Sequence, residues 1–446
     1  YLADATTGLP SGNEFTVVPY HSQFSLDAIG QPSLGVVAGG PFGTGVAGGV
    51  SMLFGDQLSD REIFAAIQAN GTVKDIGGAL QYYNMRNRWN YGGGIEHVPY
   101  VTEEIYISAD STVPGCINNP NCYDVNQLLE RIYIDQASTF TQYPFSSTRR
   151  LELSASVTHY GFDIQNYKTV FLGDEAVDQE VDNLASPYQP VWLLEPSVAL
   201  VGDNSYSAFT SPVDGERYRL QVTPTFGSAV YQTVVADYRR YLFYRPFTVA
   251  FRGVSLGRYG SGAENINSTF PFNLGDETLM RGYGYGSFTN DECVVSGANA
   301  NSLAAQAGGC PVLQRLFGSK VAVVNAEIRI PLFGTEGFGL FNFPFLPTEM
   351  APFFDAGVSY TNEQLPDFRF ATSANEIPNK CANPTTDAQA QQLAYYPCAD
   401  RIPVMSTGVS FRFNLLGYAI MEAYLAHPFQ RPTKNWVWGF QLAPGW

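Results

Sequence analysis

Charged residues are scarce in this sequence. Lys, Arg, Asp and Glu make up 15% of its 446 residues, whereas about a quarter is usual in a soluble domain. The sequence also has no run of about eighteen apolar residues, which excludes a transmembrane helix. Apolar residues nevertheless reach 45% and aromatic residues 14%. Because a spanning strand needs only about 9–11 residues and alternates apolar with polar side chains, this composition is typical of a protein that meets lipid through strands.

Basic residues are outnumbered by acidic ones. The chain has 25 Lys and Arg against 41 Asp and Glu, which gives a formal net charge of −16. Proteins that bind nucleic acid carry basic patches, so this balance argues against a nucleic-acid partner. The acids gather in the stretches 102–110 and 173–183, which we interpret as solvated loops. Neither stretch has the ligand spacing of a divalent-cation site.

The sequence lacks the motifs of catalysis and of metal or cofactor binding. Its four histidines, His21, His97, His159 and His427, are scattered, and no G-x-S-x-G occurs. There is no C-x-x-C and no His near a Cys, which argues against zinc. A G-x-G-x-x-G motif spans 43–48, but an alternating strand follows it where a dinucleotide site needs a helix. We therefore expect no enzymatic activity, no metal and no cofactor.

The cysteines fall in close pairs, each within one stretch rich in small and turn-forming residues. Six cysteines allow 15 disulfide connectivities, so proximity is the basis for pairing them locally. Disulfides in loops imply an oxidising compartment. The expected bridges are Cys116–Cys122, Cys293–Cys310 and Cys381–Cys398.

A period of two dominates the chain. Between 321 and 330 every even residue is apolar, whereas Asn325, Glu327 and Arg329 occupy odd positions. A soluble sandwich would bury the apolar face and a membrane barrel would turn it to lipid, and the alternation fits both. The polar faces carry Arg, Glu, Asn and Ser but few Lys, which favours an interior polar network and hence the barrel.

We predict an all-β chain, a 16-stranded antiparallel transmembrane β-barrel with long extracellular loops, over residues 20–446. Residues 1–19 are expected to be a short N-terminal entry segment. An even number of strands suits a closed barrel, which leaves no edge unpaired in lipid. The links expected to be long and external are 102–125, 173–187, 260–318 and 361–403, and they contain all six cysteines.

One glycine-rich stretch, 272–288, contains a single Arg-Gly-Tyr formed by Arg281, Gly282 and Tyr283. Two later strands each place one acid among small or apolar neighbours, Glu327 in NAEIRIP and Asp355 in FFDAG. In these motifs, and in the closing AYLAHPF and WGFQLAPGW, the chain resembles the BamA-like outer-membrane barrel superfamily, also called the bacterial surface antigen family. The resemblance is strong from about 270 to 446 and weaker from 20 to 270.

The resemblance implies a structural site inside the barrel. In that superfamily the sixth outer loop folds back into the lumen, and its motif arginine pairs with acids on the inner wall. The matching residues are Arg281, with Gly282 and Tyr283, against Glu327 and Asp355. The chemistry of these residues agrees, because a guanidinium stays charged when buried and carboxylates can hold it bidentately. Its predicted role is to lock the loop, not to catalyse a reaction.

The resemblance also implies an integral protein of the cell outer membrane of a Gram-negative-type bacterium. It would act in protein translocation or insertion, in contact with outer-membrane lipid and lipopolysaccharide, with polypeptide substrates or other envelope subunits as partners. Assembly factors of the superfamily carry periplasmic domains that receive substrate, and residues 1–19 show none. Residues 70–94 also resemble barrels fused behind propeller or peptidase-like modules. A non-conducting membrane anchor or scaffold for another domain or subunit, and a passive pore, therefore stay open as alternatives.

Overall fold

The computed structural model describes most of the chain from residue 23 to residue 442. The remaining gaps are short except for two in the long links. They are 31–32, 41–42, 71–72, 110–115, 117–118, 120, 174, 266–268, 270, 285–286, 290–291, 293–310, 373–399, 416, 418 and 432. The expected entry segment 1–19 lies outside the described residues.

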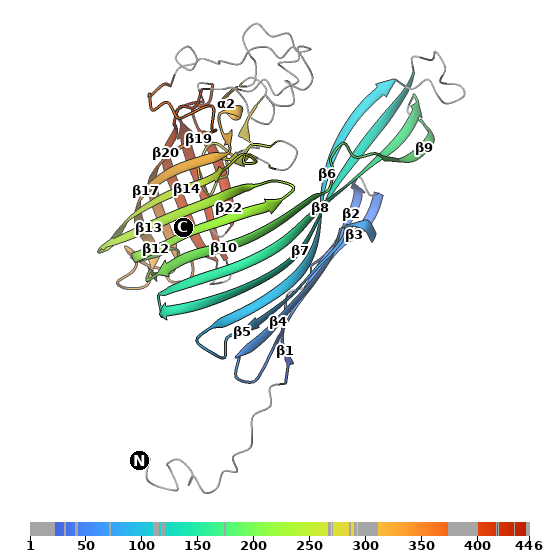
Figure 1. The fold of residues 1–446 in the computed structure, drawn as a ribbon. Coiled ribbons are helices and arrows are strands. Elements are labelled where there is room, and N and C mark those ends of the chain that lie inside the picture. The colour runs from blue at the N-terminus through green and yellow to red at the C-terminus, as the bar shows by residue number, and fades with distance from the viewer. Residues whose placement is uncertain are drawn as a thin grey trace.

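Nearly all described regular structure is β, as predicted (Figure 1). Two stretches of strand, β15 (Phe272–Asn273) and β16 (Phe317–Gly318), form a small sheet of their own. The others belong to one large sheet. They are β1 (Ser25–Ile29), β2 (Ser33–Gly40), β3 (Gly43–Gly55), β4 (Arg61–Asn70), β5 (Ile76–Asn84), β6 (Asn90–Ala109), β7 (Cys122–Ser146), β8 (Arg149–Leu172), β9 (Glu175–Leu184), β10 (Val191–Asp203), β11 (Tyr206–Ser207), β12 (Pro212–Gly227), β13 (Tyr231–Tyr244), β14 (Phe247–Tyr259), β17 (Lys320–Gly334), β18 (Phe341–Asn342), β19 (Thr348–Tyr360), β20 (Val404–Leu415), β21 (Ala419–Pro428) and β22 (Val437–Leu442).

The large sheet is a meander, because each long strand pairs antiparallel with the next along the chain. The ladder runs β3–β4–β5–β6–β7–β8–β10–β12–β13–β14–β17–β19–β20–β21–β22. Both β1 and β2 pair with β3. Among the described strands no ladder joins β22 to β1 or β2, and the count of sixteen stays a prediction. In Figure 1 the red C-terminal strands curl together, while the blue N-terminal strands lie at the far edge.

The faces of the sheet are inverted relative to a soluble protein. On β17 the apolar Val324 and Ile328 are 57% and 51% exposed, whereas Glu327 and Arg329 are 2% and 1% exposed. Charged side chains are almost never this buried in soluble domains unless they are paired, and aliphatic side chains are usually inside. The outward face is therefore apolar and the inward face polar, the arrangement of a sheet whose outer side meets lipid.

The connections differ between the two ends of the sheet. At one end short turns join β3 to β4 and β5 to β6; we call this the short-turn end. The opposite, long-loop end carries the links that contain the cysteines. Two of the links expected to be loops contain strand. Residues 102–109 continue β6, and 175–184 form β9 against β8, because long neighbouring strands offer them ladder partners.

Helical structure is minor in the described residues. It comprises the 3-10 turn η2 (Val73–Asp75) and the single turn α2 (Pro311–Gln314). No described helix is both long enough and apolar enough to cross a bilayer.

The disulfide Cys116–Cys122 is present, as predicted, at the start of β7, and both of its cysteines are buried beside Val170. The other two predicted bridges, Cys293–Cys310 and Cys381–Cys398, lie outside the described residues.

Replacing Cys116 and Cys122 together by Ser should loosen the start of β7 while the sheet stays folded. The bridge closes a loop with a sequence separation of 6, and a cross-link over so short a loop stabilises its segment by about 2 kcal/mol. Hydrogen exchange of residues 122–130 should accelerate, with the global unfolding midpoint unchanged. Unaltered exchange there would show that the ladder with β8 holds the segment by itself.

Candidate functional site

The site is the contact between the loop after β14 and the inner wall of the C-terminal strands. Leu274, Met280 and Tyr283 of this loop are fully buried against Val321, Val323 and Val404 of the wall. The upper part of the inner wall is thus apolar and holds the loop by packing. Farther toward the short-turn end the same face becomes charged, and the side chain of Arg281 lies in that charged region.

Arg281 is clamped by three carboxylates. Its Nε and Nη2 donate to Asp355 at 2.9 and 2.8 Å. Its Nη1 donates to Glu327 at 2.6 Å and to Glu422 at 3.2 Å. The guanidinium also lies 3.6 Å from the centroid of the Phe353 ring. With Arg281 only 3% exposed, every polar edge of its head group faces a partner, so the loop has one defined seat.

Burial by itself would lower the pKa of the Arg281 guanidinium. The negative charges of Asp355 and Glu327 outweigh burial, so that the pKa of Arg281 is raised above the ordinary arginine value. The side chain therefore stays charged at any physiological pH.

Gly282 allows the chain to turn at this seat. Its φ is +85°, a left-handed conformation that a residue with a Cβ rarely adopts. A Cβ here would also come within 3.0 Å of the Ala426 Cβ on β21. Tyr283 follows, and its hydroxyl donates to the Met405 carbonyl at 2.9 Å and accepts from the Gln430 N–H at 3.1 Å. Burial raises the pKa of Tyr283, so the phenol stays protonated.

The clamp is part of a larger buried charge network, which we call the wall network. Its central carboxylate, Glu327, accepts from Arg412 at 2.7 and 2.9 Å and from Arg329 at 2.8 Å, in addition to Arg281. Three guanidiniums thus converge on one carboxylate. The members are Arg281, Arg329 and Arg412 with Glu327, Glu349, Asp355 and Glu422, which gives a formal charge of 3 − 4 = −1.

The wall network reaches the short-turn end of the sheet. Glu349, beside Arg412, accepts hydrogen bonds from the hydroxyls of Thr210 and Ser211 at 3.1 and 2.7 Å. These two residues belong to the turn between β11 and β12. Buried polar contacts therefore connect the Arg281 loop to a turn at the opposite end.

Sequence reasoning pointed to Arg281, Gly282, Tyr283, Glu327 and Asp355, and the structure brings all five together. It did not single out Arg412, Glu349 and Glu422. A signal was available for two of them. Arg412 shares the polar face of its strand with Gly408 and Ser410, and Glu422 is the single acid of β21.

A second set of contacts holds the loop at the long-loop end. Arg431, in the turn after β21, donates to both Glu292 oxygens at 2.8 Å, to the Gly282 carbonyl at 2.7 Å and to Ser287 Oγ at 2.8 Å. Burial would raise the pKa of Glu292, but its hydrogen bonds with Arg431 lower the pKa below the ordinary glutamate value. No motif in the sequence indicates this contact.

Acid should release this upper contact. Because the pKa of Glu292 is depressed in the folded loop, its stabilisation is present above the ordinary pKa of 4.5 and is lost as pH falls through the lower folded value. Hydrogen exchange of residues 287–289, corrected for intrinsic rates, should rise between pH 5 and pH 3. Glu292→Gln should already exchange fast at pH 5 and lose this pH dependence. Equal protection in variant and parent would contradict the prediction.

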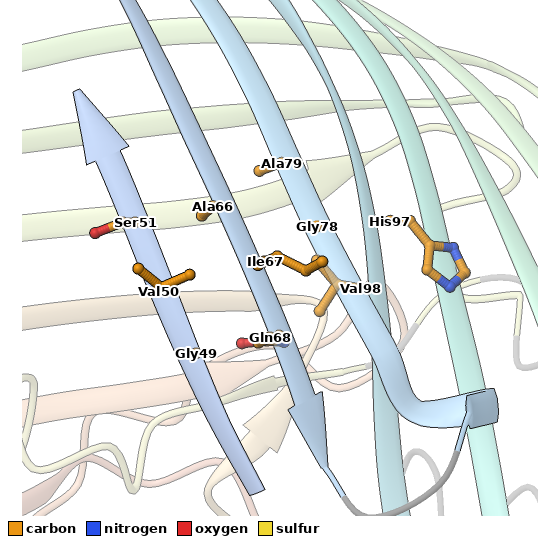
Figure 2. Close-up of a pocket in the computed structure, with 10 residues that line it drawn as sticks. All are labelled: Gly49, Val50, Ser51, Ala66, Ile67, Gln68, Gly78, Ala79, His97 and Val98. Atoms are coloured by element: carbon orange, nitrogen blue, oxygen red, sulfur yellow. The ribbon is translucent and has the colours of Figure 1, made fainter. Parts of the chain in front are cut away.

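A hollow of about 320 Å³ lies on the N-terminal strands β3 to β6, away from the wall network (Figure 2). Small residues such as Gly49, Ala66, Gly78 and Ala79 leave this space. Its one titratable lining residue is His97, so it offers no cluster for catalysis. Among the described residues no group of His, Cys, Asp and Glu has the geometry of a metal site.

Comparison with known proteins gave matches in structure. No protein-family model matches the sequence, and no curated protein matches it. The crystal structure of BamA from Haemophilus ducreyi lacking POTRA domains 1–3 aligns over 94% of this chain and 71% of that one, with a TM-score of 0.52 and 12% identity. The chain has a BamA-like barrel fold. The resemblance seen in the sequence is therefore confirmed at the level of the fold.

A second structure is similar over less of its own length. CdiB from Acinetobacter baumannii aligns over 90% of this chain and 56% of that chain, with a TM-score of 0.43 and 11% identity. The present chain thus spans little more than half of CdiB.

Proposed function

We propose that this chain is an integral outer-membrane barrel that acts in the insertion or translocation of polypeptides at the outer membrane. The observation that carries the proposal is the seat of Arg281 between Glu327, Asp355 and Glu422 inside a BamA-like sheet. Such a clamp keeps a long loop inside the wall, where it occupies the interior of the C-terminal half.

Membrane location is supported by the inverted faces of the sheet. Val324 and Ile328 face outward, whereas charged partners fill the inner side. The disulfide at the long-loop end fits an oxidising environment. In this proposal the long-loop end faces outward, in contact with lipopolysaccharide, and the short-turn end faces the periplasm. Polypeptide substrates or other envelope subunits are the proposed partners, with no nucleic acid and no catalytic chemistry.

A non-conducting anchor or scaffold is the second candidate, and the same loop favours it over a passive pore. Leu274, Met280 and Tyr283 are fully buried against the inner wall, so the loop covers this part of the wall. A loop fixed inside the barrel suits a barrel that holds another module in the membrane as well as it suits an insertion factor.

Reconstitution tests the proposed activity. Proteoliposomes containing the chain should fold an added, urea-unfolded small outer-membrane barrel faster than empty liposomes, as followed by its protease-resistant form. The matched control is the Arg281→Ala chain, in which the loop is freed while the sheet remains. If the parent chain does not accelerate folding of the added barrel, the anchor is the better-supported function.

Planar bilayers separate both candidates from a pore. The parent chain should show no steady conductance, because the clamped loop occupies the interior. Arg281→Ala should conduct intermittently as the loop leaves its seat. Steady conductance of the parent, unchanged in the variant, would identify a passive pore.

A further inference from the structure

A phenylalanine-rich segment at the short-turn end is unusually exposed. It joins β17 to β19 and comprises residues 333–347, which we call the Phe hairpin. Phe341, Phe343 and Phe345 are 62%, 48% and 71% exposed, and Phe333 and Leu340 are 39% and 48% exposed. Residues 337–347 include no charged side chain. A contiguous exposed apolar patch of this kind marks an interaction surface.

The Phe hairpin is built rather than loose. Its backbone turns back on β17, where Leu340 N–H donates to the Pro331 carbonyl and Phe343 N–H to the Gly334 carbonyl, both at 2.9 Å. The short strand β18 pairs in parallel with the end of β17, placing Phe341 opposite Phe333. Neighbouring rings pack together. The ring centroid of Phe343 lies 5.9 Å from that of Phe333 and 6.0 Å from that of Phe345. Hydrogen bonding thus holds the apolar side chains outside the sheet.

The height of the hairpin places it at one boundary of the outward apolar face. From Val324, which is 57% exposed, to Phe333 is nine residues along β17. At about 3.3 Å per residue and a tilt of about 40°, this is roughly 23 Å of height, close to the apolar band of about 25 Å in outer-membrane barrels. The hairpin therefore continues the lipid-facing surface at its periplasmic border.

The surroundings match a lipid leaflet. The adjacent β13–β14 turn exposes Tyr244 and Phe247, at 63% and 41%, beside the hairpin. The exposed Arg245 of that turn places its guanidinium next to Gly337, where a phosphate head group would lie. Aromatic side chains with a flanking arginine are typical of membrane interfaces. Phe lacks the polar group of Tyr and Trp, so it suits the acyl chains below the head groups.

We propose that the Phe hairpin inserts into the periplasmic leaflet, with Phe341, Phe343 and Phe345 among phospholipid acyl chains. The proposal rests on the membrane location given under the proposed function. The β3–β4 and β5–β6 turns also expose Leu58, Met85 and Trp89, but Asp60, Arg86 and Arg88 lie among these side chains and keep the turns at the water boundary. The periplasmic border of the protein is therefore uneven, deepest in lipid at the β17–β19 connection. Continuity with the outward faces of β14 and β17 commits the patch to lipid rather than to a protein partner.

Fluorescence quenching in bilayers tests this. A cysteine is introduced at Phe343, or at Phe345 as a second variant, and labelled with an environment-sensitive fluorophore in the full chain. Ile328→Cys reports the lipid-facing band, and Asn87→Cys, in the exposed β5–β6 turn, reports water at the same end. Phospholipid carrying a nitroxide on its acyl chain should quench positions 343 and 345 as strongly as position 328, with Asn87 unaffected. Aqueous iodide should quench Asn87 alone.

The outcomes are distinguishable. If lipid nitroxide quenches position 328 but iodide quenches 343 and 345, the hairpin lies in water and the inference is overturned. If position 343 is shielded from both quenchers only at high protein density, a second copy of the chain covers the patch. That result also overturns the inference. Failure of lipid nitroxide to quench position 328 would instead remove the membrane location on which the inference rests.

Discussion

Replacing Glu327 by Gln should destabilise the protein more than any other single change in the inner wall. The carboxylate accepts from Arg281, Arg329 and Arg412 at 2.6 to 2.9 Å, and it is 2% exposed. The amide keeps the shape but presents an NH2 group to guanidiniums that can only donate. Removing one partner of a buried ion pair costs about 3–5 kcal/mol. With three cations affected, we expect the upper end of that range.

Equilibrium urea unfolding in lipid vesicles, followed by circular dichroism, measures this change. The matched control is Glu363→Gln, an identical substitution at an exposed position in the link after β19, which should stay within about 0.5 kcal/mol of the parent. If both variants unfold at the same urea concentration as the parent, the three contacts of Glu327 contribute no net stability.

Replacing Arg281 by Ala should unseat the loop while the sheet stays folded. The wall network then holds Glu327, Glu349, Asp355 and Glu422 with two guanidiniums, and its formal charge falls to 2 − 4 = −2. We expect a loss of about 3–5 kcal/mol, since buried carboxylates lose their partner. Arg281→Lys should recover only part of it, because an ammonium cannot hold Asp355 bidentately.

The readout specific to Arg281 is hydrogen exchange of loop residues 274–284, which should become fast in the Ala variant and intermediate in the Lys variant. The control is Arg86→Ala in the exposed β5–β6 turn, which should leave that exchange unchanged. The double variant Arg281→Ala/Glu327→Gln should cost less than the sum of the single changes, because the two residues share one contact. Strict additivity, or a loop still protected in Arg281→Ala, would show that the apolar packing of Leu274 and Met280 seats the loop unaided.

Strand positions were accessible to sequence reasoning because alternation is a local property. The alternating stretch 321–330 lies within β17. The prediction that 173–187 forms a loop was wrong. Its acids suggested solvated coil, but β8 extends far enough to offer a ladder partner, and β9 forms on it with nearly every residue exposed. Context of this kind overrides strand propensity.

The candidate site divides in the same way. Alternation placed Glu327 on the polar face of its strand, and the Arg-Gly-Tyr motif drew attention to Arg281. Neither pattern predicts that Glu422, 141 residues from Arg281 in the chain, reaches the same guanidinium. That contact depends on the register of β19, β20 and β21, which sets Glu349 opposite Arg412 and Arg412 opposite Glu422.

The sequence by itself determined which side chains share one face of a strand, because in an extended strand each residue points opposite to its neighbours whatever lies beside it. It also determined which loop could carry a buried cation. The tertiary structure decided that the apolar face is the outward one. Only the tertiary structure decided which charges share a partner, since pairing follows the register between strands far apart in the chain. It likewise decided that the Phe hairpin projects outward, because hydrogen bonds to the end of β17 hold it there.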